Sequence, residues 1–211
     1  MVKFWNWFTK ITGWPVQKIV FRTHVYYEDR ETQDRRISGP AIVVCNHSSI
    51  WDFAALMFVF WSRTIRYQMA EVLFEKKLLG MFLRMLGGIR VDRTTHDFSF
   101  VNKSNEILQK GGVVGVFPES RLPKPDEERP LPFKPSAAYL ALTANVPVIP
   151  VYSNGIYFNK KHASVIIGKP VNVYDFVDES LSEKENIDNV TKAMRERIIE
   201  LGEELEKYEK D

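Results

Sequence analysis

Short apolar runs alternate with helical patterns along most of this chain. From Ala41 onward the pattern predicts strands over residues 41–45, 65–69, 89–91, 113–117 and 146–152. It predicts helices between them over residues 51–61, 74–86, 98–109 and 136–145. Continuous apolar strands alternating with helices are typical of an α/β domain whose central sheet is flanked by helices. We therefore predict a single α/β domain with a central mixed sheet.

The segments on either side of this alternating pattern carry weaker signals. Residues 24–36 are polar and indicate a loop or an edge strand, and residues 164–173 indicate a further edge strand. Apolar residues recur every three or four positions from Ile187 to Tyr208, which predicts a helix over residues 183–208. Such a stripe usually packs against a core.

The first 22 residues predict two short amphipathic helices. One would run over residues 2–12 and end at Gly13, and Pro15 would start the second, through Arg22. On the first helix, Phe4, Trp5, Phe8 and Ile11 share one face, and Lys3, Asn6 and Lys10 fall on the other. Aromatic and cationic residues together favour contact with the headgroup region of a membrane. The alternative is a helix packed on the core of its own domain.

Composition adds few constraints. The chain has 211 residues, enough for one domain, and its formal charge of +2 does not indicate a nucleic-acid-binding protein. A single cysteine, Cys45, excludes an internal disulfide and fits a reducing compartment. No secretory signal is evident, and the longest apolar run, residues 53–61, is about half of the ~20 residues that a membrane span needs. We expect a peripheral protein on the cytoplasmic face of a membrane.

A histidine and an aspartate follow the first apolar strand, at His47 and Asp52. The spacing from Ser49 to Asp52 is that of a capping box, so a helix should begin near Ser49 and leave His47 on the turn before it. The chain could then fold back, so that the carboxylate orients the imidazole as a base for an attacking hydroxyl. The alternative is a histidine and an aspartate that only cap the helix.

Four sequence blocks, at residues 43–52, 88–93, 116–121 and 146–151, occur in an order that resembles the glycerolipid acyltransferase family, whose best-known members are the lysophosphatidic acid acyltransferases. The resemblance spans roughly residues 40–173, and it implies that residues 23–211 form an acyltransferase domain behind an interfacial segment, residues 1–22. It implies transfer of a fatty acyl group from acyl-CoA or acyl-ACP to the free hydroxyl of lysophosphatidic acid, giving phosphatidic acid. His47 would be the base and Asp52 its partner, with no acyl-enzyme and no cofactor.

The resemblance also implies a set of acceptor-binding residues. These are Arg93, Glu119, Ser120, Arg121 and Lys134. Arginine suits a phosphate because its planar guanidinium can donate two hydrogen bonds at once. The block at residues 119–121 lacks the glycine of the family and is shorter, which leaves the acceptor open; a lyso-ornithine lipid is the nearest alternative. The loop that carries Lys134 could instead be a solvated loop.

Other chemistry has less support in the sequence. Neither a metal-ligand spacing nor a glycine-rich nucleotide loop is present. Cys45 lies within an apolar strand and is interpreted as a buried residue rather than a nucleophile. Two alternatives from other classes stay open: a lipid hydrolase in which His47 activates water, and a non-enzymatic peripheral membrane protein in which His47 is dispensable.

Overall fold

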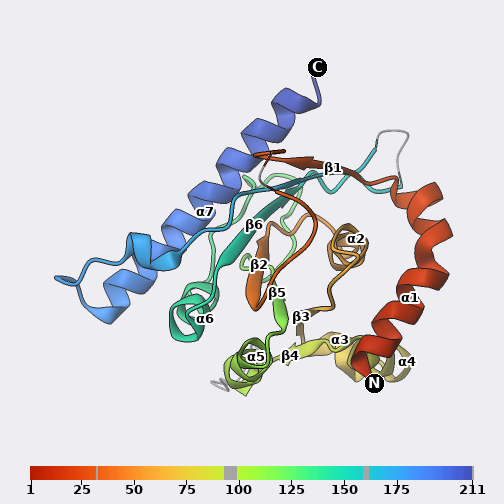
Figure 1. The fold of residues 1–211 in the computed structure, drawn as a ribbon, viewed down its shortest axis with the longest axis horizontal. Helices are drawn as coiled ribbons and strands as arrows, with labels where there is room; N and C mark the ends of the chain where they lie inside the picture. The colour runs from red at the N-terminus through yellow and green to blue at the C-terminus, as the bar shows by residue number, and fades with distance from the viewer. Residues whose placement is uncertain (32, 93–98, 159–161, 211) are drawn as a thin grey trace.

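A seven-stranded sheet forms the centre of the computed structural model, which describes residues 1–31, 33–92, 99–158 and 162–210 (Figure 1). Its strands are β1 (His24–Tyr27), β2 (Ala41–Cys45), β3 (Ile65–Ala70), β4 (Ile89–Val91), β5 (Val113–Val116), β6 (Val148–Ser153) and β7 (Ser164–Ile167). They lie in the order β1-β7-β6-β2-β5-β3-β4. Neighbouring strands are parallel except β6 and β7, which pair antiparallel. The predicted mixed sheet is confirmed.

Two apolar layers cover the two faces of the sheet. On one face, residues such as Ile42 and Val44 pack with helices α5 (Ser99–Gln109), α6 (Ser136–Ala144) and α7 (Glu183–Tyr208). On the other face, Val43 and Cys45 pack with α2 (Asp52–Val59). The carboxyl ends of β2, β5 and β6 meet at one edge of the sheet, which is where parallel-sheet proteins usually form their sites.

Two predicted elements differ from the structure. The segment expected to be an edge strand contributes β7, which lies inside the sheet between β1 and β6, whereas β1 is the edge strand. The helix predicted over residues 74–86 is divided into α3 (Val72–Glu75) and α4 (Lys77–Leu86) by the extended backbone of Lys76. The two helices pack so closely that a Cβ on Gly80 would lie 2.3 Å from the carbonyl oxygen of Phe74.

The first helix does not end at Gly13. Helix α1 (Val2–Val16) continues through Pro15 into one wide helical turn, η1 (Gln17–Phe21). Gly13 instead permits a close approach, because a Cβ at that position would lie 2.8 Å from the ring of Phe58 on α2. The prediction of two helices separated at Gly13 is therefore wrong.

The buried face of α1 is its polar face. The side chains of Asn6 and Lys10 are each only 2% exposed. Asn6 donates to the carbonyl oxygen of Leu86 at 2.7 Å. Lys10 donates to the carbonyl oxygens of Phe60, Trp61 and Arg63, which follow the C-terminus of α2, at 3.1, 3.0 and 2.7 Å. A cation at this end of a helix satisfies free carbonyl groups and the helix dipole, and burial lowers the pKa of Lys10 to about 8, so it still carries its charge at neutral pH.

The opposite face of α1 and η1 is apolar and exposed. It carries Phe4, Phe8, Ile11 and Ile19, whose side chains are between 49% and 72% exposed. None of the helices that the structure describes combines the length and apolar character needed to cross a bilayer. Helix α1 thus contacts the domain through the polar side chains of Asn6 and Lys10 and leaves its apolar stripe facing outward. We call this set of four residues the outer stripe.

Candidate active site

His47 and Asp52 lie together at the carboxyl end of β2. Nδ1 of His47 is 3.0 Å from Oδ2 of Asp52. Asp52 begins α2 and is fully buried, and the backbone between the two residues forms a turn, because the amide of Asp52 donates to the carbonyl oxygen of Ser49. The expected fold-back of the carboxylate onto the imidazole is present, with the helix starting three residues later than Ser49.

Three further donors hold the carboxylate of Asp52. The backbone N–H groups of Ser48 and Ser49 each donate to Oδ2 at 2.8 Å, and the hydroxyl of Tyr157 donates to Oδ1 at 2.9 Å. The position at the N-terminus of α2 adds a favourable interaction with the helix dipole. Burial, and after it the charge of Asp52, raises the pKa of Tyr157, so its hydroxyl keeps its proton and acts as a donor.

The imidazole of His47 is fixed on one side and open on another. Its ring stacks on Phe117 with 4.5 Å between centroids and 25° between planes, and its side chain is 22% exposed. No hydrogen bond engages Nε2 within the part of the chain that the structure describes. With Nδ1 directed to Asp52, Nε2 is the atom available to take a proton from a bound hydroxyl.

Glu119 lies directly beside this turn, but its carboxylate contacts the backbone. Oε1 accepts the N–H of His47 at 2.7 Å, and Oε2 accepts the N–H of Leu131 at 2.8 Å. Glu119 is 4% exposed. Burial raises the pKa of Glu119, and its two backbone hydrogen bonds oppose that shift. Glu119 thus links the turn that carries His47 to the loop that follows β5, a role that the sequence did not reveal.

Ser120 occupies a left-handed backbone conformation, with φ of 64°. Glycine adopts such a conformation without steric cost, whereas other residues do so at roughly 1–2 kcal/mol. Ser120 is the position where the resembled family has its glycine, and its left-handed backbone is one that glycine would favour.

The remaining predicted binding residues are placed differently. The guanidinium of Arg121 forms a two-fold ion pair with Glu127, at 2.6 and 2.7 Å, on the surface of the loop after β5. Arg121 holds the pKa of Glu127 at about 2. Lys134 lines a groove of about 460 Å³ between α6 and the start of α7, with Tyr139 and Ile187. Arg93 lies outside the described residues.

The sequence analysis missed the contribution of the segment that follows β6. Asn46 is buried and bridges to Ser153, accepting its N–H at 2.8 Å and donating to its carbonyl oxygen at 2.9 Å. Gly155, with φ of 67°, passes so close to the turn that a Cβ there would lie 2.4 Å from Cβ of Ser48. This approach brings Tyr157 to Asp52. The only sequence signal was the Asn-Gly pair at residues 154–155, which is typical of a turn.

Comparison with known proteins supplies the family. The family model described as Acyltransferase matches residues 19–154, more than half of the chain. A 1-acyl-sn-glycerol-3-phosphate acyltransferase of Bacillus subtilis is 29% identical over 170 residues, covering 78% of this chain and 82% of that protein. The enzyme of the same name from Haemophilus influenzae is 26% identical, covering 85% of this chain and 77% of that protein.

The fold also matches a solved structure. The crystal structure of the 1-acyl-sn-glycerophosphate acyltransferase from Thermotoga maritima aligns over 95% of this chain and 79% of that chain, with a TM-score of 0.65 and 24% sequence identity. The resemblance identified from the four sequence blocks is thereby confirmed. This chain belongs to the Acyltransferase family and is an acyltransferase.

Proposed function

We propose that this protein transfers a fatty acyl group from a thioester to the free hydroxyl of lysophosphatidic acid, giving phosphatidic acid for phospholipid synthesis. The observation that carries the proposal is the contact of 3.0 Å between Nδ1 of His47 and a fully buried Asp52, with Nε2 open. The names of the relatives from Bacillus subtilis and Haemophilus influenzae support the choice of acceptor.

The reaction follows from this geometry. Nε2 of His47 takes the proton of the acceptor hydroxyl. At the same time the hydroxyl oxygen attacks the thioester carbonyl carbon and forms the new C–O bond. Asp52 holds the ring orientation and stabilises the imidazolium that results. The C–S bond then breaks, and the imidazolium returns the proton to the departing thiolate. The acyl group ends on the acceptor oxygen, and no residue of the protein is acylated.

Cys45 takes no part in this scheme. It lies on β2 next to the site, but it is buried, and burial raises the pKa of its thiol well above its usual range. A thiol in that state is a poor nucleophile. Its position therefore supports direct transfer over a covalent cysteine intermediate.

The acceptor phosphate, in our proposal, binds on the β5 side of His47. Arg121 follows β5, which lies on that side of β2, and Arg93 follows β4 in the sequence. We assign phosphate binding to these two arginines, with Ser120 shaping the loop and Lys134 at its far end. Glu119 then acts by positioning the backbone of His47, because both of its oxygens already accept backbone N–H groups.

The outer stripe of α1 and η1, in our proposal, docks the enzyme on the cytoplasmic face of a membrane without crossing it. Phe4, Phe8, Ile11 and Ile19 face outward. Exposed apolar side chains on one helical face, flanked by a cation such as Lys3, suit the boundary between headgroups and acyl chains. Acceptor and product are both lipids, so the site must reach that boundary.

Turnover of the purified protein tests the proposal. A set of lysolipids, including lysophosphatidic acid and a lyso-ornithine lipid, is offered with acyl-CoA and with acyl-ACP, and products are identified by mass spectrometry. We expect phosphatidic acid from the wild type and none from a folded His47→Ala variant. Asp52→Asn should lower turnover on the order of 10³- to 10⁴-fold, whereas the surface substitution Glu203→Gln on α7 should change nothing.

The same experiment separates the alternatives. If product forms only from lyso-ornithine lipid, that lipid is the acceptor in place of lysophosphatidic acid, and the proposed mechanism stands. Release of free fatty acid without acceptor, at the rate of transfer, would identify a hydrolase. Full transfer by a folded His47→Ala protein would reject the mechanism itself.

A further inference from the structure

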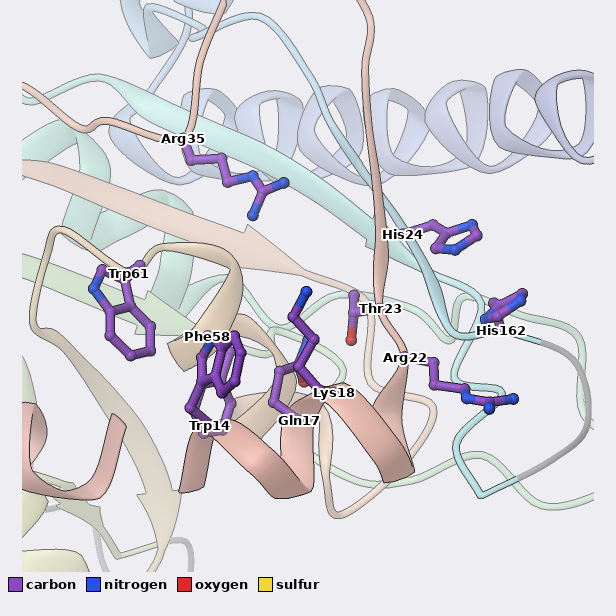
Figure 2. Close-up of a pocket in the computed structure, with 10 residues that line it drawn as sticks. All are labelled: Trp14, Gln17, Lys18, Arg22, Thr23, His24, Arg35, Phe58, Trp61 and His162. Atoms are coloured by element: carbon purple, nitrogen blue, oxygen red, sulfur yellow. The ribbon is translucent and has the colours of Figure 1, made fainter. Parts of the chain in front are cut away.

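A cavity of about 770 Å³ lies between the N-terminal segment and β1, outside the site described above (Figure 2). Its wall comes from η1, from the start of β1 and from α2 with the residues that follow it. Figure 2 shows Lys18 reaching into the middle of the cavity, with Trp14 and Phe58 on one side and Arg22 on the other. The volume is within the range of roughly 300–1,000 Å³ that small-molecule sites occupy.

The wall is strongly cationic. It contains Lys18, Arg22 and Arg35, and no aspartate or glutamate is among the residues that line it. None of these three cations forms an ion pair with any residue that the structure describes. Arg35 donates to the hydroxyl of Tyr27, and Lys18 lies over the ring of Trp14 at 5.3 Å. Cations gathered without counter-charges favour a ligand that carries phosphate groups.

Two histidines extend this cationic wall. His24 begins β1 and His162 precedes β7, and their rings stack with 4.2 Å between centroids. Figure 2 shows the pair next to Arg22 at one end of the cavity. Their ring nitrogens add hydrogen-bonding groups to the same end.

Two polar atoms in the wall are buried without a partner. Oε1 of Gln17 and Oγ1 of Thr23 are both inaccessible to solvent and accept or donate no hydrogen bond in the described part of the chain. Buried polar groups are nearly always satisfied in folded proteins. Both residues line the cavity, and a change of side-chain rotamer would turn either oxygen toward a polar ligand bound there.

The cavity lies near the turn that carries His47, on the side of β2 away from Arg121. Helix α2 connects the two, since Asp52 is at its start and Phe58, six residues later, lines the cavity; the rise between them is about 9 Å. Phe21 lies between cavity and turn, with its ring 6.1 Å from Trp51 and 5.5 Å from Tyr157. The cavity is on the β7–β1 side of the sheet, whereas Arg121 follows β5 on the other side of β2.

We propose that this cavity binds the phosphate-bearing end of the acyl donor, and that the donor is coenzyme A, held by its adenosine 3′,5′-bisphosphate. The inference rests on the proposed function, because it assumes a thioester that reaches His47. The cations would bind the phosphates, and the rings of Trp14 and Trp61 offer surfaces for the adenine. Gln17 and Thr23, with their side chains turned toward the cavity, would contact the polar edge of the adenine. The pantetheine arm would pass Phe21 and present the thioester to Nε2 of His47.

A direct binding measurement tests this inference separately from catalysis. The full chain carrying His47→Ala is titrated with coenzyme A and with adenosine 3′,5′-bisphosphate by calorimetry. We expect both to bind, and we expect Lys18→Ala combined with Arg22→Ala to weaken both at least about tenfold. The control is Lys110→Ala, in a second basic cavity that shares no lining residue with the first, and it should leave affinity within about twofold.

Kinetics and lipid binding complete the test. In the active protein, the Lys18→Ala/Arg22→Ala pair should raise the KM for acyl-CoA and leave the KM for the acceptor unchanged. Absence of binding to the parent protein, or equal binding by the paired variant, overturns the inference. The inference is also overturned if the paired variant loses binding to vesicles of anionic phospholipid but keeps its affinity for coenzyme A. That result would make the cavity a lipid-headgroup site. Binding as expected without any acyl transfer would instead reject the proposed function.

Discussion

The hydroxyl of Tyr157 donates a hydrogen bond of 2.9 Å to Oδ1 of Asp52, the oxygen that does not contact His47. Tyr157 is 105 residues from Asp52 in sequence and comes from the segment after β6. It therefore fixes the carboxylate from the side opposite to the two backbone N–H groups of the turn. In the proposed mechanism Tyr157 therefore positions Asp52, the partner of the base.

Tyr157→Phe removes this hydrogen bond and keeps the aromatic packing. A hydrogen bond to a charged group contributes about 1.5–3 kcal/mol, so we expect kcat to fall about tenfold or more, with little change in either KM. The control is Tyr152→Phe on the neighbouring β6, whose side chain packs against Gly202. Steady-state kinetics checks both. An unchanged kcat for folded Tyr157→Phe would show that the backbone donors suffice.

Glu119→Gln distinguishes a positioning role from a substrate-binding role. The amide NH₂ of glutamine cannot accept from the N–H of His47 or Leu131, so one of the two donors loses its partner. We expect a loss of about 1–3 kcal/mol in the free energy of unfolding and a fall in kcat. Denaturant unfolding and kinetics measure these. If the acceptor KM rises while stability and kcat stay unchanged, Glu119 binds substrate instead of positioning His47.

In the proposed mode of acceptor binding, Glu127 competes with the phosphate for Arg121. Arg121→Ala should raise the acceptor KM about ten- to a hundredfold, because a bidentate charge-assisted contact is lost. Glu127→Gln should have the opposite effect and lower the acceptor KM, since it releases the guanidinium from its ion pair. The donor KM should not change in either variant. If both substitutions act only on the donor, the assignment of Arg121 is wrong.

The outer stripe predicts salt-resistant binding to membranes. Replacing Phe8 and Ile19 together by aspartate should strongly reduce co-sedimentation with anionic vesicles, because burying each side chain is worth about 1.5–3 kcal/mol. Phe176→Asp, an exposed aromatic on the short helix η2 (Val173–Phe176), is the control. Equal sedimentation of all three proteins would reject docking through this face. Deleting residues 1–22 is a poorer test, because it removes Lys10 from the end of α2.

The sequence predicted most of the scaffold because each buried strand is a continuous apolar run. The bounds of β2 and β4 match the expected residues, and so does α7. The contact between His47 and Asp52 was also predictable, since it depends on local spacing across one turn. Local patterns of this kind survive in the sequence regardless of the rest of the fold.

The parts that were missed depend on long-range packing. Nothing near Tyr157 reveals that its hydroxyl reaches Asp52, because Gly155 brings the two together only in three dimensions. The burial of Lys10 was missed because helical periodicity places polar residues outward by default. The cavity at Lys18 combines residues from four segments of the chain, and no single segment indicates it.

The reversed burial of α1 makes its mutational tolerance unlike that of an ordinary amphipathic helix. Replacing Lys10 by leucine would look harmless on any hydrophobicity scale, yet it would leave three carbonyl oxygens after α2 without their donor. In a saturation library selected for folded protein, Asn6 and Lys10 should therefore accept few substitutions, while Phe8 and Ile11 accept many. The apolar positions would become intolerant only when selection also requires lipid synthesis. Comparing the two selections would therefore separate residues that are needed for folding from residues that are needed for docking on the membrane.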